Sequence, residues 1–181
     1  MPLFLFELTV VPAERTAVNA LVDEVSKAAA DAGADLIESQ VTAGLDRVFA
    51  VVEAAGSAPL SAGINRTTVS SAADVSGPDQ VRLVGADLAA LKAARPSAGY
   101  LVEWDLPADL DMETYLERKR TKAPRYADVP EVSFLRTYVR EDMEKCLCFY
   151  DAPDEDVVRR GRAAVDTPID RLHALDAGTS E

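Results

Sequence analysis

The sequence is poor in the residues that metal centres and many catalytic sites use most, because it has one histidine and two cysteines. A serine–histidine–aspartate triad would have to include the single histidine, His173. Cys146 and Cys148 stand two residues apart and form no disulfide framework, which favours a reducing cytoplasm. The chain also lacks a glycine-rich phosphate loop and the GxSxG and HExxH motifs. These absences exclude the common hydrolase and nucleotide-binding classes.

Positive charge and long apolar runs are also scarce. The formal net charge is −12, with 19 basic and 31 acidic residues, so phosphate backbones would repel the chain and we expect no nucleic-acid partner. No apolar run approaches the roughly 20 residues that span a bilayer. The start MPLFLFELTV has no basic residue before Glu7, which predicts neither a signal peptide nor a membrane partner. Cations and small molecules remain plausible partners.

Two stretches of the chain predict the same order of elements, β-α-β-β-α-β. In the first stretch the predicted strands are 3–10, 36–42, 47–54 and 80–84, with helices over 13–32 and within 59–73. In the second stretch they are 100–106, 132–139, 146–150 and 169–175, with helices over 111–122 and 154–166. Asp111 and Asp154 are predicted N-caps, and a short helix over 87–95 separates the two stretches. The predicted domains are 1–86, a helical linker 87–98, and 99–181 with a short polar C-terminal tail.

This repeated order predicts an α+β fold with two ferredoxin-like units in tandem. Strands that are apolar on both sides need cover on both, so we expect the two antiparallel sheets to face each other as an intramolecular pseudo-dimer. A cleft between the sheets would be the natural ligand site. The two halves align with an offset near 96 in the first strand, which places Glu7 over Glu103. An offset of 97 in the hairpin places three residues of the first half over three of the second: Phe49, Val51 and Glu53 over Cys146, Cys148 and Tyr150.

Three motifs carry a resemblance to a known family. They are YLVEWDLP in the first strand of the second half, FLRTYVRED in the hairpin, and KCLCFYDAPDED followed by a helix and TPIDRL. Residues 99–176 with these motifs resemble a bacterial domain family of unknown function whose named members are described as nickel-binding proteins. Residues 1–86 look like a degenerate copy, with FLFELTV and VVEAAGS. The resemblance implies a ferredoxin-like fold, pairing of such units, and nickel or another divalent transition metal as ligand. It leaves a homodimer open.

Four residues are candidate metal ligands. Cys146 and Cys148 share one face of a strand, and two thiolates there could hold a soft or borderline metal with help from Glu103 and His173. The alternative is that the cysteines are small buried hydrophobic residues and that His173 is structural or exposed. On the metal interpretation, the protein is a ligand-binding module for a metal or a small molecule.

A second hypothesis is a cofactor-independent enzyme, such as an isomerase, cyclase or oxygenase, that acts on a small apolar metabolite. Glu103 interrupts an apolar strand and could act as a base, while Arg136 and Tyr138 could orient a carbonyl or carboxylate. The alternatives are a salt bridge between Glu103 and Arg136, and an arginine whose stem packs on Tyr138. A basic cluster predicts either an anion patch or charges that complement a helix C-terminus: Arg118, Lys119, Arg120, Lys122 and Arg125.

Overall fold

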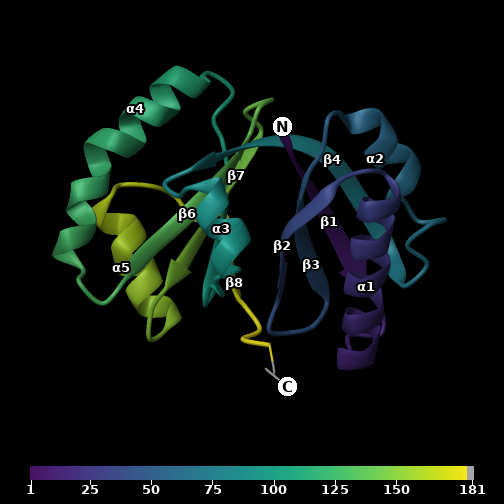
Figure 1. The fold of residues 1–181 in the computed structure, drawn as a ribbon. Helices are drawn as coiled ribbons and strands as arrows, with labels where there is room; N and C mark the ends of the chain where they lie inside the picture. The colour runs from purple at the N-terminus through teal and green to yellow at the C-terminus, as the bar shows by residue number, and fades with distance from the viewer. Residues whose placement is uncertain (179–181) are drawn as a thin grey trace. The chain divides into compact units, whose positions relative to one another are not determined.

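A computed structural model of the chain describes residues 1–178. Within that range the fold is α+β, with eight strands and five α-helices (Figure 1), and the predicted fold class is confirmed. No helix in the described residues is both long and apolar enough to cross a bilayer. The predicted polar tail lies partly outside the described residues, because it includes 179–181.

The chain forms two compact units. Unit 1 consists of Met1–Val81 and Asp87–Ser97 and takes up the chain again from Asp176. Unit 2 consists of Arg82–Ala86 and Ala98–Leu175. The short helix between the two stretches therefore belongs to unit 1, where Lys92 pairs with Glu53.

In unit 1, α1 (Arg15–Asp31) and α2 (Ser57–Gly63) lie on one side of an antiparallel sheet (Figure 1). The strands lie in the order β2-β3-β1-β4, so β1 pairs with both β3 and β4. The elements of this part of the chain are β1 (Leu3–Val10), α1 (Arg15–Asp31), β2 (Asp35–Val41), β3 (Arg47–Glu53), α2 (Ser57–Gly63), β4 (Ala72–Val84) and α3 (Leu88–Ala94).

Unit 2 repeats this arrangement. Its strands lie in the order β6-β7-β5-β8, and the end of β4, from Arg82, lies next to β6. Its elements are β5 (Tyr100–Asp105), α4 (Met112–Lys122), a 3-10 helix (Ala123–Asp128), β6 (Ser133–Arg140), β7 (Lys145–Asp151), α5 (Glu155–Ala164) and β8 (Arg171–Ala174). Each unit thus has the predicted β-α-β-β-α-β order. The pseudo-dimer with facing sheets stays a prediction.

The predicted caps of α4 and α5 are confirmed. The Asp111 carboxylate accepts from Thr114 N at 2.7 Å, and the Asp154 carboxylate accepts from Val157 N at 2.9 Å. Each bond satisfies a backbone donor that has no partner inside its helix. The N-cap of α1, Glu14, makes no such side-chain bond.

The predicted fourth strand was too short. We expected a strand over 80–84 only, but β4 runs from Ala72 to Val84. The Gly77-Pro78 pair suggests a break, because proline cannot donate to a sheet ladder. The strand continues through an irregular register next to Leu5, where Gly77 has φ 110° and a Cβ atom would lie 2.4 Å from the Leu5 carbonyl oxygen. Only glycine fits that position.

The equivalence of the two hairpins also needs correction by one residue. Glu7 pairs with Phe49 across β1 and β3, and Glu103 pairs with Leu147 across β5 and β7. If Glu7 corresponds to Glu103, then Phe49 corresponds to Leu147 and not to Cys146. A shift of one residue moves a side chain to the other face of a sheet. The helix-facing residues of β3 therefore correspond to those of β7: Val48, Ala50 and Val52 to Cys146, Cys148 and Tyr150.

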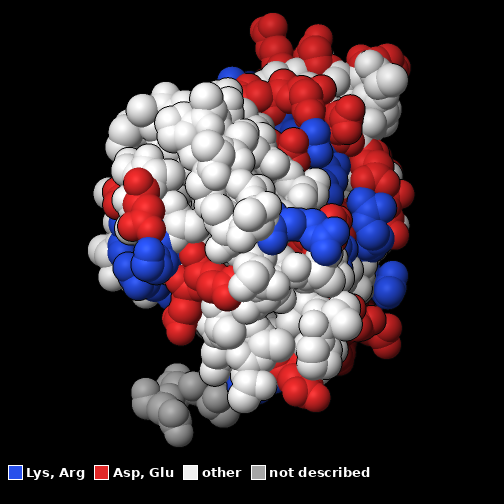
Figure 2. Space-filling model, turned by 90° about the vertical axis from the view of Figure 1, so that its right-hand side faces the viewer, with Lys and Arg blue, Asp and Glu red and all other residues white. Residues whose placement is uncertain are grey.

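The helix-facing cores of the units differ in composition. Unit 1 uses aliphatic and phenylalanine side chains, whereas unit 2 includes both cysteines, two tyrosines (Tyr115 and Tyr150) and Trp104. Figure 2 shows the surface on the side where Figure 1 draws α1 and α2. Acidic and basic residues alternate around a broad area that has neither, so on this side the charge of the chain is dispersed.

Candidate functional site

The structure does not bring the four candidate metal ligands together. Glu103 lies opposite Leu147 in the β5–β7 register, while Cys146 and Cys148 flank Leu147 and point to the other face of the sheet. The thiols belong to the helix-facing core of unit 2. His173 Nε2 lies 2.7 Å from the Glu103 carboxylate, so these two candidates form a separate group. The four candidate ligands therefore belong to two separate places in unit 2, one with the two cysteines and one with Glu103 and His173.

Glu103 is the centre of a buried ion cluster within unit 2. Its carboxylate is fully buried and accepts from Lys145 Nζ at 2.9 Å and from Arg171 Nε at 3.0 Å. The hydrogen bond of Arg171 to Asp105 is the largest contribution that raises the pKa of Arg171, and Glu103 adds to it. Unit 1 has the equivalent of one of these pairs, in which Arg47 donates to the Glu7 carboxylate at 2.6 Å.

Arg136 and Tyr138 are both buried and share the face of Glu103, as the enzyme hypothesis requires. The Arg136 guanidinium lies 4.9 Å from the centre of the Phe149 ring, and the Tyr138 ring meets the same phenylalanine edge-on at 6.0 Å. In the register, β7 separates Tyr138 from Glu103. The shared face is therefore as expected, and the catalytic role of the three residues stays a prediction.

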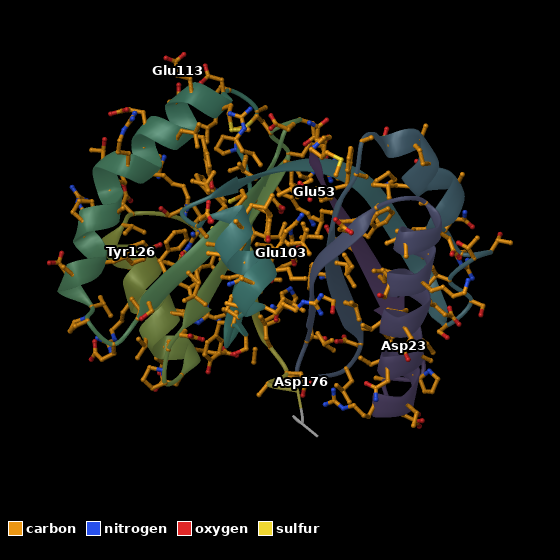
Figure 3. The ribbon with its side chains drawn as sticks, viewed as in Figure 1. Asp23, Glu53, Glu103, Glu113, Tyr126 and Asp176 are labelled. Atoms are coloured by element: carbon orange, nitrogen blue, oxygen red, sulfur yellow. The ribbon has the colours of Figure 1, made fainter. Side chains whose placement is uncertain are left out.

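The helix-facing side of unit 2 contains a cavity of about 230 Å³. The walls come from α4, the 3-10 helix, α5 and the strands, and aromatic side chains form much of the surface: Trp104, Tyr115, Tyr126 and Phe134. Figure 3 labels Tyr126, which lies between α4 and the strands. Gly85, at φ 85°, also lines the cavity, and a Cβ there would come within 2.6 Å of the Phe134 ring. The absence of a side chain at Gly85 leaves room for that ring.

Cys148 lies in the wall of this cavity and is the centre of a hydrogen-bond chain. Lys119 Nζ donates to Thr137 Oγ1 at 3.0 Å, and because an ammonium only donates, the threonine hydrogen is directed to Cys148 Sγ at 3.1 Å. Arg162 also donates to Cys148 Sγ, at 3.5 Å, and to the Tyr150 hydroxyl at 3.2 Å. The sulfur thus accepts hydrogen bonds from Thr137 and Arg162, and such donors favour the thiolate form of the cysteine.

The pKa shifts agree with this chain of donors. The thiol of Cys146 lies 3.9 Å from Cys148 Sγ, and its hydrogen bond is the main cause that lowers the pKa of Cys148 well below the usual value, with Lys119 and Arg162 adding to it. The same contact raises the pKa of Cys146. Burial alone would lower the pKa of Arg162, but the Cys148 charge and Tyr150 raise it. The two shifts therefore favour a proton on Cys146 over one on Cys148.

Part of the basic cluster in α4 is turned toward the cavity. Lys119 Nζ lies 4.3 Å from the centre of the Phe134 ring, and the Arg118 guanidinium lies 5.4 Å from that of Trp104. Both side chains are half-buried, so they do more than complement the C-terminus of α4. Of the two interpretations of this cluster, the geometry favours an anion patch at these two positions.

Arg162 is the site residue that sequence reasoning missed. It is 2% exposed and projects from α5 into the core. The signal was present, since Arg162 follows the buried Val158 by four residues and therefore shares its face of the helix. It was missed because arginines on helices are usually solvated.

The residues present do not form a preformed metal site. No group of three or more histidine, cysteine, aspartate or glutamate side chains in residues 1–178 could hold a metal ion. Each pair of candidate donors already has cationic neighbours: Lys119 and Arg162 at the thiols, Lys145 and Arg171 at Glu103. Such neighbours disfavour a divalent cation.

The motifs that suggested a family lie in the unit that contains this cavity. Residues 100–175 match the family described as "Nickel responsive protein SCO4226-like". The predicted resemblance is confirmed for this segment, all of which lies in unit 2. No curated protein matches the chain.

Two solved structures share the fold. One, provisionally described as a chlorite dismutase (TA0507), superposes with a TM-score of 0.60 at 13% identity, covering 97% of this chain and 95% of its own. The other, provisionally described as a monooxygenase of Lactobacillus acidophilus NCFM, has a TM-score of 0.52 at 12% identity, covering 97% and 92%. At such low identity these likenesses concern the fold alone.

Proposed function

We propose that the chain is a ligand-binding protein that takes a small molecule in the cavity of unit 2. The observation that supports this most is the combination of an aromatic-walled cavity with a few convergent polar groups, which is typical of small-molecule sites. Its volume is below the roughly 300–1,000 Å³ of drug-sized ligand pockets. The ligand is therefore a compact one, with a flat apolar body that packs against Trp104 and Phe134.

Two predictions from the sequence accompany this proposal. A reducing compartment such as the cytoplasm suits a chain whose cysteines are both free and buried. The repeated element order supports the pseudo-dimer with facing sheets, which a distance measurement between spin labels in the two units would test. Neither prediction is needed for ligand binding in unit 2.

Nickel binding is the second candidate, and the family match is the observation that favours it. Tag-free protein should be dialysed against nickel, desalted and assayed for retained metal, with wild type beside the Cys146→Ala/Cys148→Ala and Glu103→Gln/His173→Ala double variants. Near-stoichiometric nickel that one double variant loses would place the metal and make this the better function. Nickel that washes off all three proteins would remove it.

Small-molecule binding is tested by calorimetry with compact aromatic probes such as phenol, indole, benzyl alcohol and benzoate. We expect at least one probe to bind unit 2 with a defined stoichiometry. Leu116→Trp, which fills space in the cavity wall, should abolish binding. The matched control is Val22→Trp, at a half-buried position of α1 in unit 1, which should bind as wild type does. Binding that survives Leu116→Trp, or no binding by any probe, would refute the proposal.

A further inference from the structure

Two buried hydrogen-bond donors around the cavity of unit 2 lack a partner in the described part of the chain. They are Arg118 Nε and Arg162 Nε, and both residues line the cavity. Arg162 is 2% exposed, so water does not freely solvate it. Buried donors without partners are costly, and native structures contain few of them. Their gathering at one cavity points to an acceptor that a ligand supplies.

The two guanidinium groups are held in place at their far ends. Arg162 donates from Nη1 to Cys148 and Tyr150 and from Nη2 to the Pro168 carbonyl oxygen. Arg118 donates from Nη2 to the Asp166 carbonyl oxygen at 2.6 Å. In both residues these contacts leave Nε–H as the donor still to be satisfied. The side chains are thus fixed before any ligand arrives, which reduces the entropy cost of binding.

Positive charge also exceeds negative charge at this cavity. Arg118, Lys119 and Arg162 line it, and none of the three makes an ion pair with a carboxylate within residues 1–178. The other lysine and arginine of the α4 wall are neutralised, because Lys122 pairs with Asp166 at 2.6 Å and Arg120 pairs with Glu117. Cys148 contributes at most one negative charge to the three cations. Buried charges are normally paired, so a net positive charge remains for a ligand to balance.

We infer that the cavity of unit 2 recognises a small organic anion, specifically an aromatic monocarboxylate. This inference rests on the proposed function and names its ligand class. The planar carboxylate accepts from the guanidinium donors of Arg118 and Arg162 and from the ammonium of Lys119. The ring of the ligand packs against Trp104 and Phe134. A divalent cation is disfavoured at the same place, because it would add like charge to three cations.

A matched pair of probes tests the inference. Benzoate and benzamide have nearly the same shape, but only benzoate is charged at pH 7. Calorimetry should show benzoate binding about tenfold tighter or more, because a hydrogen bond to a charged group in a partly buried site exceeds a neutral one. Lys119→Met should weaken benzoate about tenfold and benzamide much less, because a hydrogen bond to a neutral amide is weaker than one to a carboxylate. The control, Arg159→Met, removes the same charge from the exposed side of α5 and should change neither affinity.

The outcomes separate this inference from the proposal on which it rests. Equal affinity for benzoate and benzamide, abolished by Leu116→Trp, would leave a small-molecule site but overturn the anion assignment. An equal loss of benzoate affinity in Lys119→Met and Arg159→Met would also overturn it, because a general change of net charge would then explain the effect. Failure of every probe in the panel would refute the ligand site itself. Lys119 is half-buried, so this variant tests the site without removing the fully buried Arg162.

Discussion

Units 1 and 2 have the same element order and strand order but different interiors. The ion pairs Arg47–Glu7 and Lys145–Glu103 occupy equivalent positions of the first and third strands. On the helix-facing side, Ala50 of unit 1 stands where unit 2 has Cys148. All five tyrosines of the chain, both cysteines, the tryptophan and the histidine fall between residues 100 and 173.

This difference shows how a repeated fold can divide two tasks. Unit 1 buries an aliphatic core that needs no hydrogen bonds, so its contribution is packing. Unit 2 gives part of its core to polar side chains and to a cavity, which costs stability and, on the function proposed above, creates a place for a ligand. The fold alone therefore does not indicate function, and the residues that replace the apolar core do.

The largest loss of stability should come from replacing the buried Arg162 of unit 2 by an apolar side chain. Arg162→Leu removes the donor to Cys148, Tyr150 and the Pro168 carbonyl at once. Breaking such a buried network by removing one partner should lower the free energy of unfolding by about 3–5 kcal/mol. Urea denaturation would measure it. Arg159→Leu on the same helix should change stability by less than about 0.5 kcal/mol, and a similar small change in Arg162→Leu would show that the network is dispensable.

The second largest loss of stability should come from a substitution in the apolar core of unit 1. Leu60 of α2 is fully buried in unit 1, so Leu60→Ala should cost about 3 kcal/mol through lost burial and a new cavity. Because Leu60 lies outside unit 2, the affinity of the folded variant for benzoate should be that of wild type. Denaturation and calorimetry on the same sample measure both quantities. A loss of affinity that parallels the loss of stability would contradict the division of tasks.

Much of the fold could be predicted from the sequence. Hydrophobic periodicity placed the strands and helices of both units, and the caps at Asp111 and Asp154 followed from local chemistry. The extent of β4 could not be predicted, because Gly77 and Pro78 look like a break until the neighbouring strand is known. Local sequence patterns predict local structure, whereas the irregular pairing of β4 depends on β1, which is far away in the sequence.

The candidate site was harder to predict. Cys146 and Cys148 were correctly placed on one face, but grouping them with Glu103 required knowledge of the β5–β7 register, which puts Glu103 on the other face. Arg162 was missed because charged residues are usually solvated. The sequence does not show how deeply each position of a helix is buried. Arg162 is part of the site because its position on α5 is buried next to the cavity.

A smaller loss of stability should appear at high pH. It should originate in unit 2, which holds all the tyrosines of the chain. Burial raises the pKa of Tyr126 to about 12, while an unfolded tyrosine titrates near 10. Between pH 10 and 12 the unfolded state loses this proton and the folded state keeps it, so the free energy of unfolding falls by about 1.4 kcal/mol per pH unit from this group. Below pH 10 the contribution is fully present.

Tyr126→Phe removes that contribution together with the part of the raised pKa of Tyr150 that comes from Tyr126. The stability difference between variant and wild type should shift in favour of the variant as the pH rises from 10 to 12. At pH 8 the variant loses the hydrogen bond between the Tyr126 and Tyr150 hydroxyls, which are 2.7 Å apart. Parallel pH profiles for the two proteins would show that Tyr126 ionises normally in the folded state.

The smallest effect concerns how the helices of the two units begin. Asp154 caps α5 through its side chain, whereas Glu14 at the start of α1 makes no such bond. Asp154→Ala should therefore lower the free energy of unfolding by about 1 kcal/mol, and Glu14→Ala should change it by less than about 0.5 kcal/mol. Because α5 carries Arg162, a frayed first turn should also weaken benzoate binding slightly, by less than about tenfold. Equal destabilisation by the two substitutions would mean that α1 and α5 start in the same way, and that the units differ only in their cores.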